Sequence, residues 1–128
     1  MIPEPIARWH EIAKSRDVSD LDTLLADDVV FLSPVVHTPQ RGKAITTKYL
    51  AAANMVLGGE NFHYIGQWFA KDSAVLEFVT RIDGVEIDGV DIIGWNAEGR
   101  IDCFKVMVRP LKAINALHQM MGAKLAAV

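Results

Sequence analysis

The chain has 128 residues, of which 51% are hydrophobic and 23% are charged, and its net charge at pH 7 is −3. This balance is typical of a folded globular domain and excludes a disordered or fibrous chain. The basic residues are scattered along the sequence, which argues against nucleic acid as a partner because phosphate binding needs clustered cations. No apolar run approaches the roughly 18 residues of a membrane-spanning helix, so we expect no membrane partner either.

The first residues lack the basic-then-apolar pattern of a signal peptide, so we expect one cytoplasmic domain over residues 1–128. Cys103 is the only cysteine and cannot form an internal disulfide. The four histidines are separated and show no zinc-ligand spacing, and no glycine-rich phosphate loop is present. We therefore expect no structural metal and no cofactor.

Helices and one strand are predicted in the first half of the chain. Apolar residues recur with the helical period over 4–15 and 43–57, so both segments are expected to be helices. Between them, Ser19 is expected to cap a short helix. The β-branched and aromatic run 29–33 then predicts a strand, which Pro34 ends.

The second half predicts four strands between residues 62 and 109, with turn signals at 71–72, 83–84 and 96–99. Short turns between successive strands indicate an antiparallel meander. An apolar stripe from residue 111 onward predicts a C-terminal helix. The expected fold class is α+β, in which helices from both ends and from the middle of the chain pack on a curved antiparallel sheet.

The Asp83-Gly84 turn sets the expected register of the middle hairpin. Asp-Gly favours a two-residue turn, which pairs Ile82 with Val85 and, by counting back, Leu76 with Asp91. Side chains alternate along a strand, so Asp91 falls on the face that carries the apolar residues. The predicted core face thus contains one acid.

The loop at 96–99 suits a three-residue turn with Gly99 in the left-handed conformation. Counting onward from this turn places Asp91 opposite Lys105, with Cys103 and Met107 on the inner face. The same count leaves an apolar patch on the outer face, and such a patch usually marks an interface. We therefore predict a homodimer through the outer sheet face, in which the patch comprises Val90, Ile92, Phe104, Val106 and Val108.

Asp91 has two interpretations. A carboxylate on an apolar face has to be paired, hydrogen-bonded or protonated, because its desolvation is costly. In the first interpretation Asp91 is a general acid/base in a pocket, and Lys105 tunes it or stabilises developing negative charge. In the second interpretation Asp91 and Lys105 form a structural ion pair without chemistry.

Further residues are candidates for lining the pocket, although apolar residues at these spacings are more often plain core. His37 lies in the loop after Pro34, where it could reach the rim of the pocket. Either His63 or Tyr64 should point inward, and the ambiguous turn at 71–72 leaves the choice open. The predicted substrate-binding set is Trp9, Phe31, His37, Tyr49, Tyr64, Phe78, Trp95, Met107 and Met121.

The order of elements, together with five short motifs, resembles the nuclear transport factor 2-like superfamily, and especially its SnoaL-like (polyketide cyclase-like) branch. The motifs are LLADDVVF at 24–31, SP at 33–34, RGKAI at 41–45, GVD at 89–91 and GRI at 99–101. Together they span most of the chain. The resemblance implies a conical sheet wrapped on helices, a deep apolar pocket and a dimer.

The resemblance also implies diverse functions, among them isomerases, cyclases, epoxide hydrolases and non-catalytic binding domains. Asp91 looks like the acid/base aspartate of the cyclase-like members. The last strand departs from the epoxide hydrolases, because it reads CFKVM at 103–107 where a second aspartate is expected. We thus expect a small-molecule-binding domain, either a cofactor-free isomerase, cyclase or hydrolase acting on an apolar carbonyl compound, or a non-catalytic ligand-binding or dimerisation module.

Overall fold

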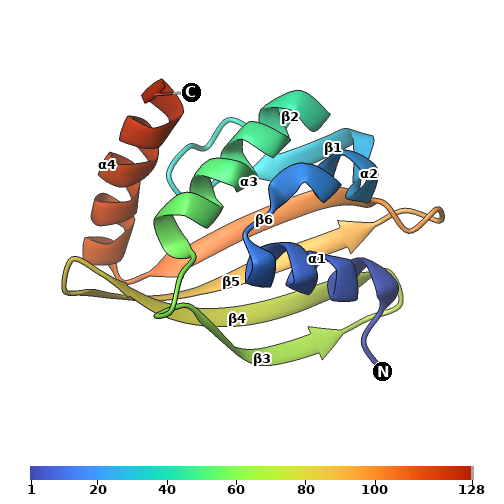
Figure 1. Ribbon diagram of the computed structural model, residues 1–128, viewed down its shortest axis with the longest axis horizontal. Helices are drawn as coiled ribbons and strands as arrows, with labels where there is room; N and C mark the ends of the chain where they lie inside the picture. The colour runs from blue at the N-terminus through green and yellow to red at the C-terminus, as the bar shows by residue number, and fades with distance from the viewer. Residues whose placement is uncertain (128) are drawn as a thin grey trace.

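The computed structural model describes residues 1–127 and has one six-stranded sheet that curls around a layer of helices (Figure 1). The strand order across the sheet is β2-β1-β6-β5-β4-β3. In chain order the elements are α1 (Glu4–Ser15), η1 (Val18–Asp20), α2 (Leu21–Leu24), β1 (Leu25–Leu32), β2 (Gln40–Arg41), α3 (Lys43–Leu57), β3 (His63–Phe69), β4 (Ser73–Ile82), β5 (Val85–Trp95), β6 (Ile101–Arg109) and α4 (Leu111–Ala127). The α+β class and the curved sheet predicted from the sequence are confirmed.

The first helix forms as its apolar period predicts, and it buries Ile6, Trp9 and Ile12. It ends at Arg16, whose left-handed conformation (φ 61°) closes the last turn with a bond from its N–H to the Ile12 carbonyl. The cap of the next turn differs from the prediction. The carboxylate of Asp17, rather than Ser19, accepts the capping bond, which comes from the Ser19 N–H.

The sheet is antiparallel except where the first long strand joins it. β1 starts at Leu25, four residues before the predicted strand, and runs parallel to β6. The two-residue strand β2 lies antiparallel on its free edge, within the segment predicted as a loop. A parallel pair needs a long crossover, and the helix α3 and the β3–β5 meander supply it. This pairing brings the N-terminal and C-terminal halves of the chain together.

The predicted register of the β4–β5 hairpin is confirmed. Ile82 pairs with Val85, and Leu76 pairs with Asp91. The turn residues Asp83 and Gly84 have φ values of 50° and 77°, as a two-residue turn of this type requires. Asp91 therefore lies on the concave face of the sheet, toward the helices.

The predicted register between β5 and β6 is wrong beyond the first pair. The turn itself forms as expected, with Gly99 at φ 76° and the Asn96 N–H bonded to the Arg100 carbonyl. Trp95 then pairs with Ile101, but Gly94 pairs with Cys103, so Asp102 is an extra residue in a β-bulge. Because side chains alternate, one extra residue exchanges the two faces of the rest of the strand.

Asp91 consequently lies opposite Val106, and Lys105 pairs with Ile92 on the convex face. Phe104 and Val106 are buried in the core rather than exposed on the outside. The predicted outer patch is thus corrected at three of its five positions, since Phe104, Val106 and Val108 all point inward. Cys103 and Met107, which were predicted to point inward, lie on the convex face instead, where Met107 is 50% exposed.

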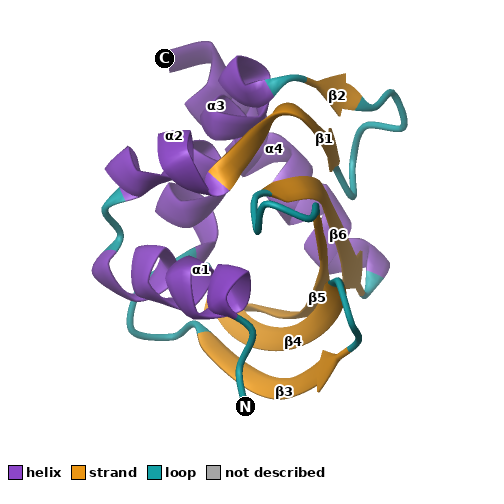
Figure 2. Ribbon diagram, turned by 90° about the vertical axis from the view of Figure 1, so that its right-hand side faces the viewer, coloured by secondary structure: helices purple, strands orange, loops and turns teal. Residues whose placement is uncertain are grey.

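Helices α1 and α3 lie over the concave face of the sheet, and α4 runs beside α3 at one end (Figure 2). The core fills the space between these helices and β1, β4, β5 and β6. None of the helices within residues 1–127 is both long and apolar enough to cross a membrane. The curvature of the sheet leaves Asp91 beneath the helices, at the centre of this layer.

Candidate functional site

Asp91 is the one buried carboxyl group among the described residues, with 6% of its surface exposed. Its strand places it on the concave face between Leu76 of β4 and Val106 of β6. Both neighbours are apolar, so the strands beside Asp91 supply no compensating charge. The group therefore depends on a partner from farther away in the sheet.

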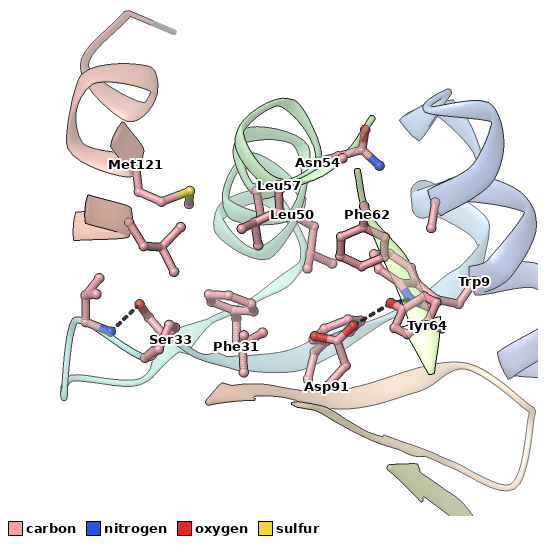
Figure 3. A pocket seen from close by; sticks show the side chains of 18 residues that line it. Trp9, Phe31, Ser33, Leu50, Asn54, Leu57, Phe62, Tyr64, Asp91 and Met121 are labelled. Atoms are coloured by element: carbon pink, nitrogen blue, oxygen red, sulfur yellow. Dashed lines mark hydrogen bonds between the residues drawn. The ribbon is translucent and has the colours of Figure 1, made fainter. Parts of the chain in front are cut away.

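That partner is Tyr64 on the edge strand β3. Its hydroxyl donates a hydrogen bond of 2.5 Å to Oδ2 of Asp91, and it accepts one of 2.9 Å from the Trp9 indole N–H. A relay of two hydrogen bonds thus runs from α1 through β3 to β5 (Figure 3). Tyr64 is the inward-pointing member of the His63/Tyr64 pair that the sequence left open.

Burial controls the acidity of this pair. Desolvation raises the pKa of Asp91 from 3.8 to about 7, although the hydrogen bond from Tyr64 acts in the opposite direction. Desolvation, followed by the charge of Asp91, raises the pKa of Tyr64 well above its ordinary value of 10. Tyr64 is therefore a neutral donor near pH 7, whereas Asp91 is poised between its protonated and ionised forms.

An apolar cavity reaches this carboxyl group, and it contains about 690 Å³ of space between its atoms, with its open mouth included. Figure 3 shows Asp91 at its floor, Trp9 and Tyr64 at one end and Met121 at the other. Oδ2 of Asp91 is bonded to Tyr64, and within residues 1–127 no donor is bonded to Oδ1. The cavity is lined by Trp9, Ala13, Phe31, Ser33, Pro34, Val35, Leu50, Ala53, Asn54, Leu57, Gly58, Phe62, Tyr64, Asp91, Phe104, Val106, Leu117 and Met121.

Five of the residues that the sequence proposed for the site meet at this cavity. They are Trp9, Phe31, Tyr64, Asp91 and Met121, which come from five different elements. Their convergence follows from the topology, because β1 lies beside β6 and the helices cross the concave face above them. A cavity lined by apolar groups, with a single acid at its floor, can bind a small apolar molecule next to a proton donor or acceptor.

The other six proposed residues lie elsewhere. Lys105 and Met107 are on the convex face because of the bulge at Asp102. His37 is exposed in the loop between β1 and β2, although its neighbours from Ser33 to Val35 line the cavity. Tyr49, Phe78 and Trp95 do not line the cavity and pack in or against the core.

Several lining residues were not foreseen. Asn54 lies one helical turn from Leu50 and Leu57, and this spacing was visible in the sequence. Arg16 fixes Asn54, because its Nε donates to Asn54 Oδ1 over 3.3 Å and its Nη2 donates to the Asn54 carbonyl over 3.2 Å. Phe104 and Val106 were missed because their faces depend on the bulge. Among the described residues no cluster of three or more histidine, cysteine or acidic side chains could hold a metal ion.

Comparison with known proteins places this arrangement in a family. The model of the SnoaL-like domain matches residues 6–103, which include Asp91 and the strands β3, β4 and β5. The chain belongs to the SnoaL-like domain family. This membership confirms the resemblance that the short motifs indicated, and with it the nuclear transport factor 2-like fold of the SnoaL-like chain.

Two crystal structures are similar over nearly the whole length of this SnoaL-like protein. A steroid delta-isomerase from Pseudomonas aeruginosa is 38% identical, with a TM-score of 0.91 over 96% of this chain and 90% of that one. A protein with a cystatin-like fold from Silicibacter pomeroyi, described as uncharacterized, is 30% identical, with a TM-score of 0.89 over 96% of this chain and 86% of that one.

The fold alone is shared with more distant proteins. The epoxide hydrolase/cyclase-like enzyme SalBIII of salinomycin biosynthesis is 14% identical, with a TM-score of 0.68 over 84% of this chain and 90% of that one. No match was found among curated proteins. Isomerase and cyclase-like proteins therefore stand among the structures that this SnoaL-like chain is similar to.

Proposed function

We propose that this protein is a cofactor-independent isomerase that moves a proton within an apolar, carbonyl-bearing molecule, with Asp91 as the acid/base group. The observation that carries the proposal is the carboxyl group of Asp91, which lies at the floor of an apolar cavity with its pKa raised to about 7. A general base works best when its pKa is near the operating pH, and burial supplies that match here.

The reaction needs no net change in protons. The ionised carboxylate of Asp91 removes a proton from the carbon next to the substrate carbonyl, and the electron pair moves toward the carbonyl oxygen. The protonated Asp91 then returns the proton at a different carbon, which shifts a double bond and restores the carboxylate. Oδ1, which faces the cavity without a donor from residues 1–127, is the oxygen assigned to this transfer.

Tyr64 has a positioning role in this scheme. Its hydrogen bond to Oδ2 holds the carboxyl group in one orientation, and the Trp9 indole holds the tyrosine hydroxyl in turn. The same bond keeps the pKa of Asp91 from rising further with burial, so that the ionised base is populated near pH 7.

Asn54 is assigned to the substrate oxygen. Arg16 bonds to its Oδ1, which leaves the Nδ2 amide hydrogens available to a ligand in the cavity that Asn54 lines. A donor fixed in advance is what stabilises the negative charge that develops on an enolate oxygen. The base and the donor thus come from opposite layers, Asp91 from the sheet and Asn54 from α3 (Figure 3).

The similarity to the steroid delta-isomerase supports this reaction class, since that protein is 38% identical along most of both chains. The apolar lining of the cavity fits the carbon skeleton of such a substrate. A β,γ-unsaturated ketone, whose double bond is not conjugated with the carbonyl group, is therefore the appropriate probe.

The test uses a 3-ketosteroid with an isolated 5,6 double bond, together with smaller β,γ-unsaturated ketones, and follows the ultraviolet absorbance of the conjugated product. Wild-type protein should convert at least one probe, and Asp91→Asn should lower kcat by about 100-fold or more. Asp28→Asn, which changes an exposed acid on β1, is the matched control and should keep full activity. Full activity in Asp91→Asn, or no conversion of any probe by the wild type, would overturn the proposal.

A further inference from the structure

A second hollow lies on the other side of Tyr64, between the C-terminal half of α1 and the start of β3. It contains about 880 Å³ of space between its atoms, with its open side included. Four of its eight lining residues have basic side chains and the other four are uncharged. The lining residues are His10, Ala13, Lys14, Arg16, Gly59, Phe62, His63 and Tyr64. We call this hollow the basic groove.

The sequence places these basic groups on two separate elements. His10 and Lys14 are four residues apart on α1 and so lie on one side of that helix, and Arg16 follows at its end. His63 begins β3. Although the whole chain has a net charge of −3, the fold collects two cations, Lys14 and Arg16, and two histidines at this one place.

The basic groove adjoins the cavity that contains Asp91. Ala13, Phe62 and Tyr64 line both hollows, and the consecutive residues Gly58 and Gly59 line the cavity and the groove, respectively. Arg16 lines the groove while its guanidinium bonds to Asn54, which lines the cavity. In Figure 3 Trp9, Phe62 and Tyr64 stand together at one end of the cavity, and two of them, Phe62 and Tyr64, also line the groove.

We infer that the ligand of this protein is amphipathic, and that an anionic group binds in the basic groove while its apolar, carbonyl-bearing part enters the cavity. This inference rests on the proposed function, because it assigns a second part to the substrate of the same site. Arg16 is held by two hydrogen bonds, so one cation of the groove is positioned before any ligand arrives. Lys14 and His63 supply the additional donors that an anion requires, whereas Nε2 of His10 is bonded to Gln67 Oε1 over 2.6 Å.

Two fluorescent probes with the same aromatic body test the inference. One is 8-anilinonaphthalene-1-sulfonate, which carries a negative charge, and the other is N-phenyl-1-naphthylamine, which is neutral. Wild-type protein should bind the sulfonate more tightly, and added salt should weaken the sulfonate alone. Lys14→Gln combined with His63→Gln should weaken the sulfonate by about tenfold and leave the neutral probe unchanged.

Lys48→Gln is the matched control, because Lys48 is an exposed cation on α3 that lines neither hollow. It should bind both probes like the wild type. Equal affinity of the wild type for the two probes, or an unchanged preference in the groove variant, would overturn the inference. Asp91→Asn separates the two proposals, since it should lower kcat by about 100-fold or more and still retain the preference for the sulfonate. If the groove prediction fails, the measured effect of Asp91→Asn on turnover still tests the proposed function.

Discussion

The Tyr64 hydroxyl reaches Oδ2 of Asp91 across a whole strand of the sheet. Tyr64 is on β3 and Asp91 is on β5, and β4 lies between them. Tyr64 pairs with Phe78, and Phe78 pairs with Gly89, so the contact runs diagonally from one strand pair to the next. The acidity of Asp91 therefore depends on residues that are distant in sequence, and this dependence can be measured.

Replacement of the buried acid should change how stability depends on pH. The folded-state pKa of Asp91, about 7, is above its ordinary value of 3.8, so the unfolded chain loses this proton first as pH rises. The stability that Asp91 contributes is therefore complete below about pH 4 and is lost as pH rises through 7. Asp91→Asn has no carboxyl group here and does not lose stability in this way. The free energy of unfolding of Asp91→Asn, relative to that of the wild type, should therefore rise by on the order of 4 kcal/mol between about pH 4 and pH 7.

Urea unfolding of the wild type, Asp91→Asn and Asp28→Asn at several pH values measures this difference. The exposed control should follow the wild type throughout. A gap between wild type and Asp91→Asn that stays constant with pH would show that Asp91 titrates normally in the folded protein.

Loss of the tyrosine hydroxyl should raise the pKa of Asp91. The hydrogen bond from Tyr64 lowers the pKa of Asp91, which burial raises to about 7. In Tyr64→Phe this hydrogen bond is absent, so the titration midpoint of Asp91 should move above about 7. Carbon NMR of labelled aspartate carboxyls measures the midpoint without reference to activity. Tyr49→Phe, which removes a hydroxyl from a residue outside the cavity, should leave the titration midpoint of Asp91 unchanged. A fall in the midpoint of Tyr64→Phe would contradict the assigned role.

Removal of Lys105, which the sequence predicted to face Asp91, should not change the pKa of Asp91. Lys105 pairs with Ile92 on the convex face, and Val106 occupies the position opposite Asp91. We therefore expect Lys105→Gln to retain the wild-type pKa of Asp91 and the wild-type rate with any substrate that is converted. The same NMR titration decides this, because a cation close to Asp91 would lower the pKa and its removal would raise it.

A methyl group at Gly89 should destabilise the floor of the site. A Cβ atom there would lie 2.5 Å from Cζ of Phe78 and 2.8 Å from the Met107 carbonyl oxygen. Gly89→Ala should therefore lower the free energy of unfolding by about 1–3 kcal/mol. Gly94→Ala on the same strand is the control, since its nearest contacts would be 3.6 Å away and ordinary. Thermal unfolding should separate the two variants, and equal melting temperatures would contradict this packing.

The convex face still carries an apolar surface, although its residues differ from those that the sequence suggested. Trp68 and Met107 are 58% and 50% exposed there, and Val90 and Ile92 lie between them. We propose that two copies pair through this face, as an apolar sheet surface favours. Light scattering at micromolar concentration should give a dimer for the wild type and a monomer for Met107→Lys.

Leu111→Lys is the control for that experiment, because Leu111 is 71% exposed at the start of α4 rather than on the convex face. It should remain a dimer. A monomeric wild type would contradict the proposed dimer through the convex face.

The order of elements and the position of Asp91 could be predicted because local signals determine them. The helical periods mark α1, α3 and α4, and the Asp83-Gly84 turn sets the register that turns Asp91 inward. The partner of Asp91 could not be predicted in the same way. An irregularity between Tyr64 and Gly66 separates Tyr64 from the turn at 71–72, and its contact crosses two strand pairs, so no count from a single turn reaches it.

The faces of β6 were predicted wrongly for a related reason. The turn at Gly99 was predicted correctly, yet Asp102 adds a residue that no composition signal marks. Every assignment beyond it was therefore reversed, including Lys105, Phe104 and Val106. The cavity residues contributed by β6 could be found only from the strand pairing itself.

The bulge at Asp102 also has a consequence for variation in chain length. Deletion of Asp102 would remove the bulge and leave Val106 opposite Asp91. Insertion of one residue directly after Cys103 would instead shift the rest of β6 by one position, so that Lys105 faces Asp91 and Phe104 and Val106 turn toward solvent. A change of one codon in length thus decides whether Asp91 lies in an apolar cavity as a weak acid or forms a buried ion pair with Lys105. In this strand a change in the number of residues alters the chemistry of the floor more than a substitution at most of its positions would.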